Sequence, residues 1–324
     1  MSAIGGFLPL EIETTRAAEP YHATAAALSS GRGCWHLILR TCRPKHVSLP
    51  FYICDAVVQP LLATGTPFEF YTIDRAFRPV LEREPEAGEL VLVVNYFGVL
   101  DSVVDGAVER HPERLVVDDT QAFFRPGRMD AWSFNSARKF FGVPDGAYLY
   151  GPANADGLPP SDTDDCDHLL ARRAGRDNHA WEQFKQHEAR IGIEPRAMSP
   201  VSARLLAAVD MRDARRRREQ NFEALHQRLG ELNTIAPTLD SLEHAAADGP
   251  MCYPFMPSSD VDRSALSRLG LFVPTLWPEI ESRRERGFDW ERCAARRLLP
   301  LPIDHRYGPD DMNTLAERLR QVLR

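Results

Sequence analysis

The sequence predicts an α/β protein in which a mostly parallel sheet lies between helices, followed by a smaller C-terminal α+β domain. Three observations lead to this fold class. Short apolar segments alternate with helical patterns over residues 47–150, as in sheets built from strand–helix–strand units. Two of these segments, 90–96 and 115–119, are largely apolar, which is typical of central strands covered on both faces. Shorter elements follow from about residue 235, and we place the domain boundary so that residues 1–207 and 208–324 form the two domains.

The first half of the chain supplies the elements of the large domain. A Ser/Gly turn at 29–33 precedes a helical pattern with its apolar residues on one face. The free N–H groups at such a helix start suit a phosphate, although a simple N-cap turn explains the pattern equally well. Helices are predicted to end near residue 62 and to span 103–110. The predicted strands are 47–50, 68–73, 90–96, 115–119, 131–135 and 147–150.

The second half begins with a segment rich in Pro, Gly and Asp at 151–167, which predicts a loop. A helical pattern follows at 178–190, and a single long helix is predicted from Ser199 through Leu229. A strand at 251–255 and helices at 261–268 and 310–323 are expected in the small domain.

Composition narrows the possible partners and location. The net charge of −7 gives no reason to expect binding to nucleic acid or to an anionic membrane. Six cysteines show no C-x-x-C pair and no zinc-type spacing, so no metal site is expected. The N-terminus shows no secretory pattern, and no apolar run is long enough for a membrane span. We therefore expect a cytoplasmic protein.

Lysine is rare in this chain, and one lysine lies in an unusual setting. Only Lys45, Lys139 and Lys185 occur, although arginine is abundant. A lysine that must act as a neutral amine cannot be replaced by arginine, which stays charged. Lys139 follows two serines and precedes Phe140 and Phe141, which are expected to shield its amine from water. A catalytic lysine and a plain surface lysine at a strand end are equally compatible with this window.

Polar residues follow three of the predicted strands, at 95–96, 118–121 and 133–139. The carboxyl ends of parallel strands meet at one edge of a sheet, where ligands bind, so we expect these groups to converge. Asp118 ends a buried strand, where a carboxylate is tolerated only when it is paired. A turn-forming aspartate after a strand is the alternative interpretation.

An amine, a strand-end carboxylate and a phosphate-sized turn are together what pyridoxal 5'-phosphate (PLP) requires. PLP forms a Schiff base with a lysine and needs an acid that keeps its pyridine nitrogen protonated. Its phosphate needs backbone N–H and hydroxyl donors. Asp118 suits the pyridine nitrogen, and Gln121 could reach the ring hydroxyl.

These residues carry a resemblance to a known family. The chain resembles the DegT/DnrJ/StrS-type PLP-dependent sugar aminotransferases, a family of PLP fold type I for which a mostly parallel seven-stranded sheet is implied. Segments similar to the family's motifs occur in the family's order over most of the chain. They are 30–34, 49–54, 95–98, 117–122, 133–146, 217–222 and 298–303.

The resemblance implies roles for the lysine and its neighbours. Lys139 would bind the cofactor covalently and then act as the base that moves the proton. Asp118 would pair with the pyridine nitrogen, and Gln121 would contact the ring oxygen.

The resemblance also implies how the rest of the cofactor is held. The backbone amides of Gly31 and Arg32 would bind the phosphate, together with Ser133 or Ser136. Tyr52 or Cys54 would lie against the ring. Tyr52 is preferred because an aromatic side chain stacks better.

The implied activity is transfer of an amino group from an amino acid, expected to be glutamate, to a keto sugar or related carbonyl in surface-polysaccharide or secondary-metabolite biosynthesis. A homodimer is expected, because active sites in the family form between two subunits. Two alternatives remain: a PLP-dependent lyase or dehydratase, and a catalytically idle PLP-fold binding protein. The presence of Lys139 argues against the family's dehydratases, which have histidine at this position.

Overall fold

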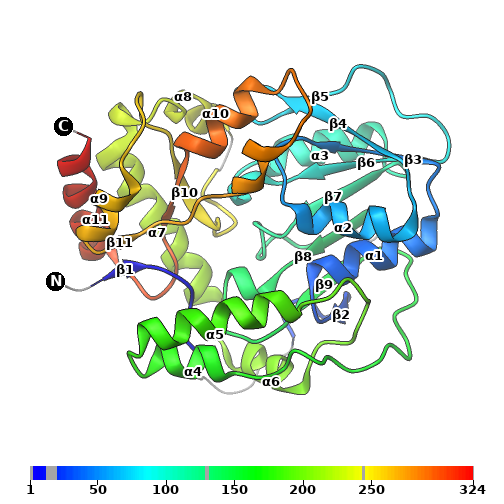
Figure 1. The fold of residues 1–324 in the computed structure, drawn as a ribbon, viewed down its shortest axis with the longest axis horizontal. Helices are drawn as coiled ribbons and strands as arrows, with labels where there is room; N and C mark the ends of the chain where they lie inside the picture. The colour runs from blue at the N-terminus through cyan, green and yellow to red at the C-terminus, as the bar shows by residue number, and fades with distance from the viewer. Residues whose placement is uncertain (1–2, 12–19, 128–130, 243–244, 324) are drawn as a thin grey trace.

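The computed structural model describes residues 3–11, 20–127, 131–242 and 245–323. An eight-stranded sheet, with helices on both faces, forms one side of the molecule (Figure 1). Its strands follow the order β2-β9-β8-β7-β6-β3-β4-β5. They are β2 (Ala26–Leu28), β3 (His46–Pro50), β4 (Phe68–Ile73), β5 (Pro79–Val80), β6 (Glu89–Val94), β7 (Leu115–Asp119), β8 (Trp132–Asn135) and β9 (Ala147–Tyr150).

The prediction of a mostly parallel sheet is confirmed. Strands β4, β3, β6, β7 and β8 are parallel neighbours, whereas β9, β2 and β5 join by antiparallel pairing. Within the described residues this sheet has eight strands and not seven, because the two-residue strand β5 extends one edge. Strand β2, which is absent from the predicted strands, pairs with β9 at one edge of the sheet.

The central strands are apolar because helices cover both of their faces. Every residue of β7 is buried, and so are five of the six residues of β6. Helix α1 (Gly31–Cys42) packs on β8 and β9, and α3 (Asp101–Arg110) packs on β7. Each fully buried aliphatic side chain stabilises the fold by about 1.5–3 kcal/mol. Helix α2 (Asp55–Thr64) packs beside α1.

The prediction of a single long helix from Ser199 to Leu229 is wrong at one point. The structure has two helices, α6 (Pro200–Ala208) and α7 (Met211–Leu229). Val209 takes an extended conformation, and the Asp210 side chain accepts a hydrogen bond from the N–H of Asp213. This aspartate therefore begins a new helix by capping it, which the apolar periodicity of the segment does not reveal.

The C-terminal part packs around α7 and α11, with small sheets of its own (Figure 1). Strand β10 (Cys252–Phe255) pairs antiparallel with β12 (Leu299–Pro302), and β1 (Ile4–Gly5) pairs with β11 (Leu271–Phe272). The remaining α-helices are α4 (Asp167–Arg173), α5 (Asp177–Arg190), α8 (Ala236–Ser241), α9 (Arg263–Arg268), α10 (Asp289–Arg297) and α11 (Pro309–Val322). Among the described helices, none has both the length and the apolar character needed to cross a membrane.

Candidate active site

A pocket of about 150 Å³ lies at the carboxyl ends of the parallel strands. It brings together the start of α1, the loop into α2, the ends of β7 and β8, and the end of α5. The lining residues are Ser30, Gly31, Arg32, Trp35, Cys54, Ala56, Val57, Asp118, Thr120, Phe134, Ser136, Arg138, Lys139, Glu188 and Ile191.

The start of α1 supplies backbone donors to this pocket. The Ser30 side chain caps the helix by accepting a hydrogen bond from the Gly33 N–H at 3.0 Å. The N–H groups of Gly31 and Arg32 have no hydrogen-bond acceptor among the described residues. A Cβ at Gly31 would lie only 3.1 Å from a methyl carbon of Thr120, so glycine lets the helix start approach the end of β7. Free N–H groups at the positive end of a helix favour an anion.

Lys139 and Asp118 meet through Thr120. The Lys139 ammonium donates to the Thr120 hydroxyl at 2.9 Å, and Asp118 Oδ1 accepts from the Thr120 N–H at 2.9 Å. Asp118 is only 4% exposed, whereas the lysine sits beyond it on the short helical turn Ala137–Lys139. The pocket therefore combines a buried carboxylate with a reachable amine. Thr120 was not singled out from the sequence, because a threonine after a strand is an unremarkable residue.

The surroundings of Lys139 differ from the expectation that phenylalanines shield it. Phe140 and Phe141 are buried in a separate aromatic cluster with Phe123 and Phe124, and they do not line the pocket. The Lys139 side chain itself is exposed. The expected shielding is wrong because the chain turns at this point and directs the two rings into the core.

The pleat of β8 separates the two serines proposed for the phosphate. Phe134 lines the pocket, and Ser136, two residues later, lines it as well. Ser133 lies on the opposite face, where its hydroxyl is buried and has no hydrogen-bond partner among the described residues. The structure thus brings Ser136, and not Ser133, to the α1 start.

The two candidates for contact with the cofactor ring are also separated. Cys54 lines the pocket, close enough to Lys139 and Asp118 for both charges to act on its thiol. Burial raises the pKa of this thiol, and the nearby Lys139 charge opposes that shift. Tyr52 does not line the pocket. It is fully buried, and its ring packs edge-on against Trp277 at 4.5 Å.

Gln121 is occupied by a structural contact. Its side chain is 1% exposed and accepts a hydrogen bond from the Phe97 N–H at 2.5 Å. Phe97 has a left-handed backbone conformation with φ of 62°, so this bond holds a tight turn after β6. Gln121 does not line the Lys139 pocket in this structure.

Three charged side chains surround the mouth of the pocket. Arg138 forms an ion pair with Glu188 on α5, and the Arg32 guanidinium donates to the Ile191 carbonyl. Burial lowers the pKa of Arg32, whose Nε has no partner among the described residues. Glu188 could not be placed here from the sequence alone, because α5 is distant in sequence from the strand ends.

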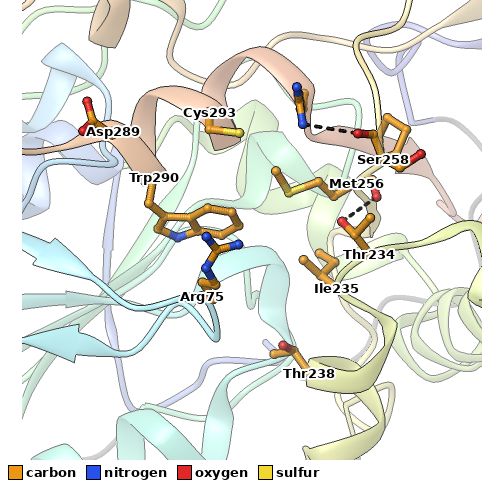
Figure 2. A pocket seen from close by; sticks show the side chains of 11 residues that line it. Arg75, Thr234, Ile235, Thr238, Met256, Ser258, Asp289, Trp290 and Cys293 are labelled. Carbon is orange, nitrogen blue, oxygen red and sulfur yellow. Dashed lines mark hydrogen bonds between the residues drawn. The ribbon is translucent and has the colours of Figure 1, made fainter.

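A larger hollow of about 780 Å³ lies elsewhere, between the turn after β4, α8 and α10. Figure 2 shows the Arg75 guanidinium beside the Trp290 ring, and the two are 5.3 Å apart. Ile235, Met256 and Cys293 supply apolar walls. This hollow shares no lining residue with the Lys139 pocket, and no lysine is among its lining residues. We therefore place the candidate active site at Lys139.

Several solved structures of aminotransferases have a fold similar to that of this chain. The aminotransferase TlmJ from Streptoalloteichus hindustanus superposes with a TM-score of 0.68 at 16% identity, covering 99% of this chain and 98% of that one. The sugar aminotransferase described as putative, Spr1654 from Streptococcus pneumoniae, gives 0.66 at 12% identity over 99% and 98% of the two chains. DesV from S. venezuelae gives 0.63 at 19% identity over 92% and 84%.

The chain has the fold of the sugar aminotransferases. A structure named as a DegT DnrJ EryC1 StrS aminotransferase, from Brucella abortus, matches with a TM-score of 0.61 at 14% identity, covering 92% of this chain and 85% of that one. The predicted fold class is thereby confirmed. No protein-family model and no curated protein compared with the chain gave a match.

Proposed function

We propose that this protein is a PLP-dependent aminotransferase that moves an amino group from an amino acid, with glutamate as the expected donor, to a keto sugar or related carbonyl. One observation carries the proposal: Lys139, Asp118 and the free N–H groups of α1 line a single pocket in a chain with the fold of sugar aminotransferases. Spr1654, which shares this fold, was solved in PLP and PMP forms, and DesV with a ketimine intermediate.

The donor set of the pocket fits the cofactor. The unpartnered N–H groups of Gly31 and Arg32, with the Ser136 hydroxyl, would hold the phosphate. Asp118, buried in the same pocket, would hold a proton on the pyridine nitrogen. Cys54 rather than Tyr52 is the candidate neighbour of the ring, since Cys54 alone of the two lines the pocket. When bound, PLP supplies an electron sink for the carbon that bears the amino group.

Residues of this chain would hold the cofactor and the substrate and would move the protons. Lys139 is the amine that reaches the pocket, so it would attach the cofactor and later remove the proton from the substrate carbon that bears the amino group. Thr120 would orient Lys139 through its hydroxyl and Asp118 through its N–H. Glu188 neutralises Arg138 at the mouth, so the Arg32 guanidinium leaves one net positive charge there that suits a substrate carboxylate.

The decisive test replaces Lys139 by alanine. The wild-type protein is expected to be yellow with PLP, and glutamate is expected to bleach the visible band. Lys139→Ala should lose that band and at least 100-fold of the activity, because no other group replaces a covalent nucleophile. Its melting temperature should change little, since the side chain is exposed.

Lys185→Ala is the matched control, because Lys185 is an exposed lysine paired with Glu182 on α5. It should keep both colour and activity. A Lys139→Ala protein with full activity would contradict the assignment. A colourless wild type that ignores added PLP would favour an idle binding protein, and a coloured protein indifferent to amino donors would favour a lyase.

The proposed function also suggests where the protein is located and how its subunits assemble. We propose a cytoplasmic homodimer in which the two subunits complete each other's sites. Sedimentation of the purified protein should give twice the mass of 36.5 kDa. A monomer with full activity would contradict the shared site.

A further inference from the structure

A cluster of two histidines and one aspartate lies in the helical hairpin formed by α4 and α5, at the bottom of Figure 1. Asp165 precedes α4, His168 lies in its first turn, and His187 lies in the last turn of α5. One ligand atom from each residue lies within 4.8 Å of the others. The histidines are 1% and 0% exposed, while the carboxylate is 34% exposed and leaves an entry path from solvent.

Hydrogen bonding fixes the orientation of the His187 ring. Its Nε2 lies 2.8 Å from the carbonyl oxygen of Pro144, so this nitrogen carries the proton and donates. The lone pair of Nδ1 then faces Asp165 Oδ2 at 3.5 Å. Metal-binding histidines usually donate their second nitrogen to a carbonyl or carboxylate in this way. Two acceptors that face each other are stabilised by a positive charge placed between or beside them.

His168 supplies a buried nitrogen without a partner among the described residues. Its Nδ1 has no hydrogen-bond partner among the described residues, although the side chain is almost wholly buried. A buried polar atom left unpaired destabilises the fold, and a bound ion would give it a partner.

An arginine at present provides the positive charge at this place. The Arg190 guanidinium pairs with Asp165, and its Nη2 lies 3.5 Å from His187 Nδ1. The Arg190 side chain is 54% exposed, so it can turn into solvent at little cost. Arg190 is therefore a competitor for the site and not an obstacle built into the core.

We propose that Asp165, His168 and His187 bind one zinc ion, with water as the fourth ligand. Imidazole nitrogens and a carboxylate suit zinc, whereas magnesium and calcium prefer oxygen ligands alone. The 3.5 Å between His187 Nδ1 and Asp165 Oδ2 is close to the edge of about 3.3 Å expected when zinc lies about 2.0–2.1 Å from each ligand. Asp165 and His168 lie at the start of α4, and a short turn joins that helix to α5, which carries His187. Side-chain movements of His168 and Arg190 would complete the site.

The site would fasten the hairpin beside the candidate active site. His187 precedes Glu188, which lines the Lys139 pocket and pairs with Arg138. Pro144, the acceptor for His187, belongs to the loop that follows Lys139. Bound zinc would therefore hold both α4 and α5 against the segment that carries the lysine. This role does not depend on the identity of the reaction.

The test uses the full chain without a histidine tag, freed of metal by a chelator and titrated with zinc by calorimetry. One equivalent should bind and raise the melting temperature, and cobalt in its place should give the visible bands of a tetrahedral site. Asp165→Asn and His168→Gln should each weaken zinc binding at least 10-fold. Asp165 is partly exposed, so its variant should fold even if the His168 variant does not.

Two further variants complete the design. His179→Gln, an exposed histidine on α5, should leave zinc binding unchanged. Arg190→Gln should tighten binding, because it removes the competing charge. The proposal is overturned if neither the wild type nor Arg190→Gln binds one equivalent of zinc. It is also overturned if Asp165→Asn binds zinc as tightly as the wild type.

Discussion

Thr120 shows at the residue scale how the candidate site is assembled. Its hydroxyl accepts from Lys139 and its N–H donates to Asp118, so a single residue fixes the distance between amine and carboxylate. It also lies against the start of α1, because its methyl carbon is 3.1 Å from the position that a Cβ on Gly31 would take. The three parts that a PLP site requires are therefore joined at one residue.

The two serines of the Lys139 segment differ in a way that can be measured. Ser136 lines the pocket and Ser133 does not. A hydrogen bond to a charged group is worth about 1.5–3 kcal/mol, so Ser136→Ala should weaken PLP binding about 10- to 100-fold. Ser133→Ala, its matched control, should leave the dissociation constant unchanged. Equal effects of the two substitutions, followed by fluorescence titration, would show that the pocket is not the phosphate site.

At the scale of elements, a segment from the C-terminal part holds the loop that carries Cys54. The Arg283 guanidinium donates to the carbonyl oxygens of Phe51 and Ile53 at 2.6 and 2.7 Å, and it pairs with Asp55. Glu279 accepts from the Asp55 N–H at 2.9 Å and so caps the start of α2. Residues that follow β11 thus shape one wall of a pocket built mainly from the parallel sheet.

Removing this contact should loosen the loop and lower stability. Arg283→Ala removes a charged donor from two carbonyl groups and a carboxylate, and the expected loss in the free energy of unfolding is about 2–4 kcal/mol. Arg284→Ala changes an exposed neighbour and should stay within about 0.5 kcal/mol of the wild type. Urea unfolding of both variants makes the comparison. Similar midpoints for the two would show that Arg283 does not hold the loop.

Individual strands and helices differ in how well they could be predicted from the sequence. Strands such as β7 were predictable because every residue in them is buried, which leaves a continuous apolar run. Strand β2 was missed because alanine has low strand preference and its pairing with β9 is non-local. Asp118 and Lys139 could be placed in one site because strand ends converge, whereas Glu188 could not, since its position depends on how α5 packs.

At the scale of the whole molecule, buried titratable groups make stability depend on pH. His22 is 2% exposed, and its Nδ1 lies 2.7 Å from the Tyr150 hydroxyl on β9. Burial lowers the pKa of His22 to about 4, although a hydrogen bond with the Phe123 backbone opposes the shift. Asp101 acts in the other direction: burial, with a contribution from Asp248, raises its pKa to about 7. Between about pH 4 and pH 7 the two groups therefore change the free energy of unfolding in opposite directions as the pH changes.

The substitution His22→Gln should isolate the contribution of His22 to the pH dependence of the free energy of unfolding. An unfolded histidine binds a proton near pH 6.5, whereas the folded His22 does so only near pH 4. Between these values the unfolded state gains protons, so the free energy of unfolding falls as pH falls. From pH 7 to pH 5 the wild type should lose about 2 kcal/mol more than the variant, in urea unfolding at each pH. Because Asp101 is present in both proteins, its opposing slope cancels from the difference. Parallel curves for the two proteins would mean that His22 titrates normally in the folded state.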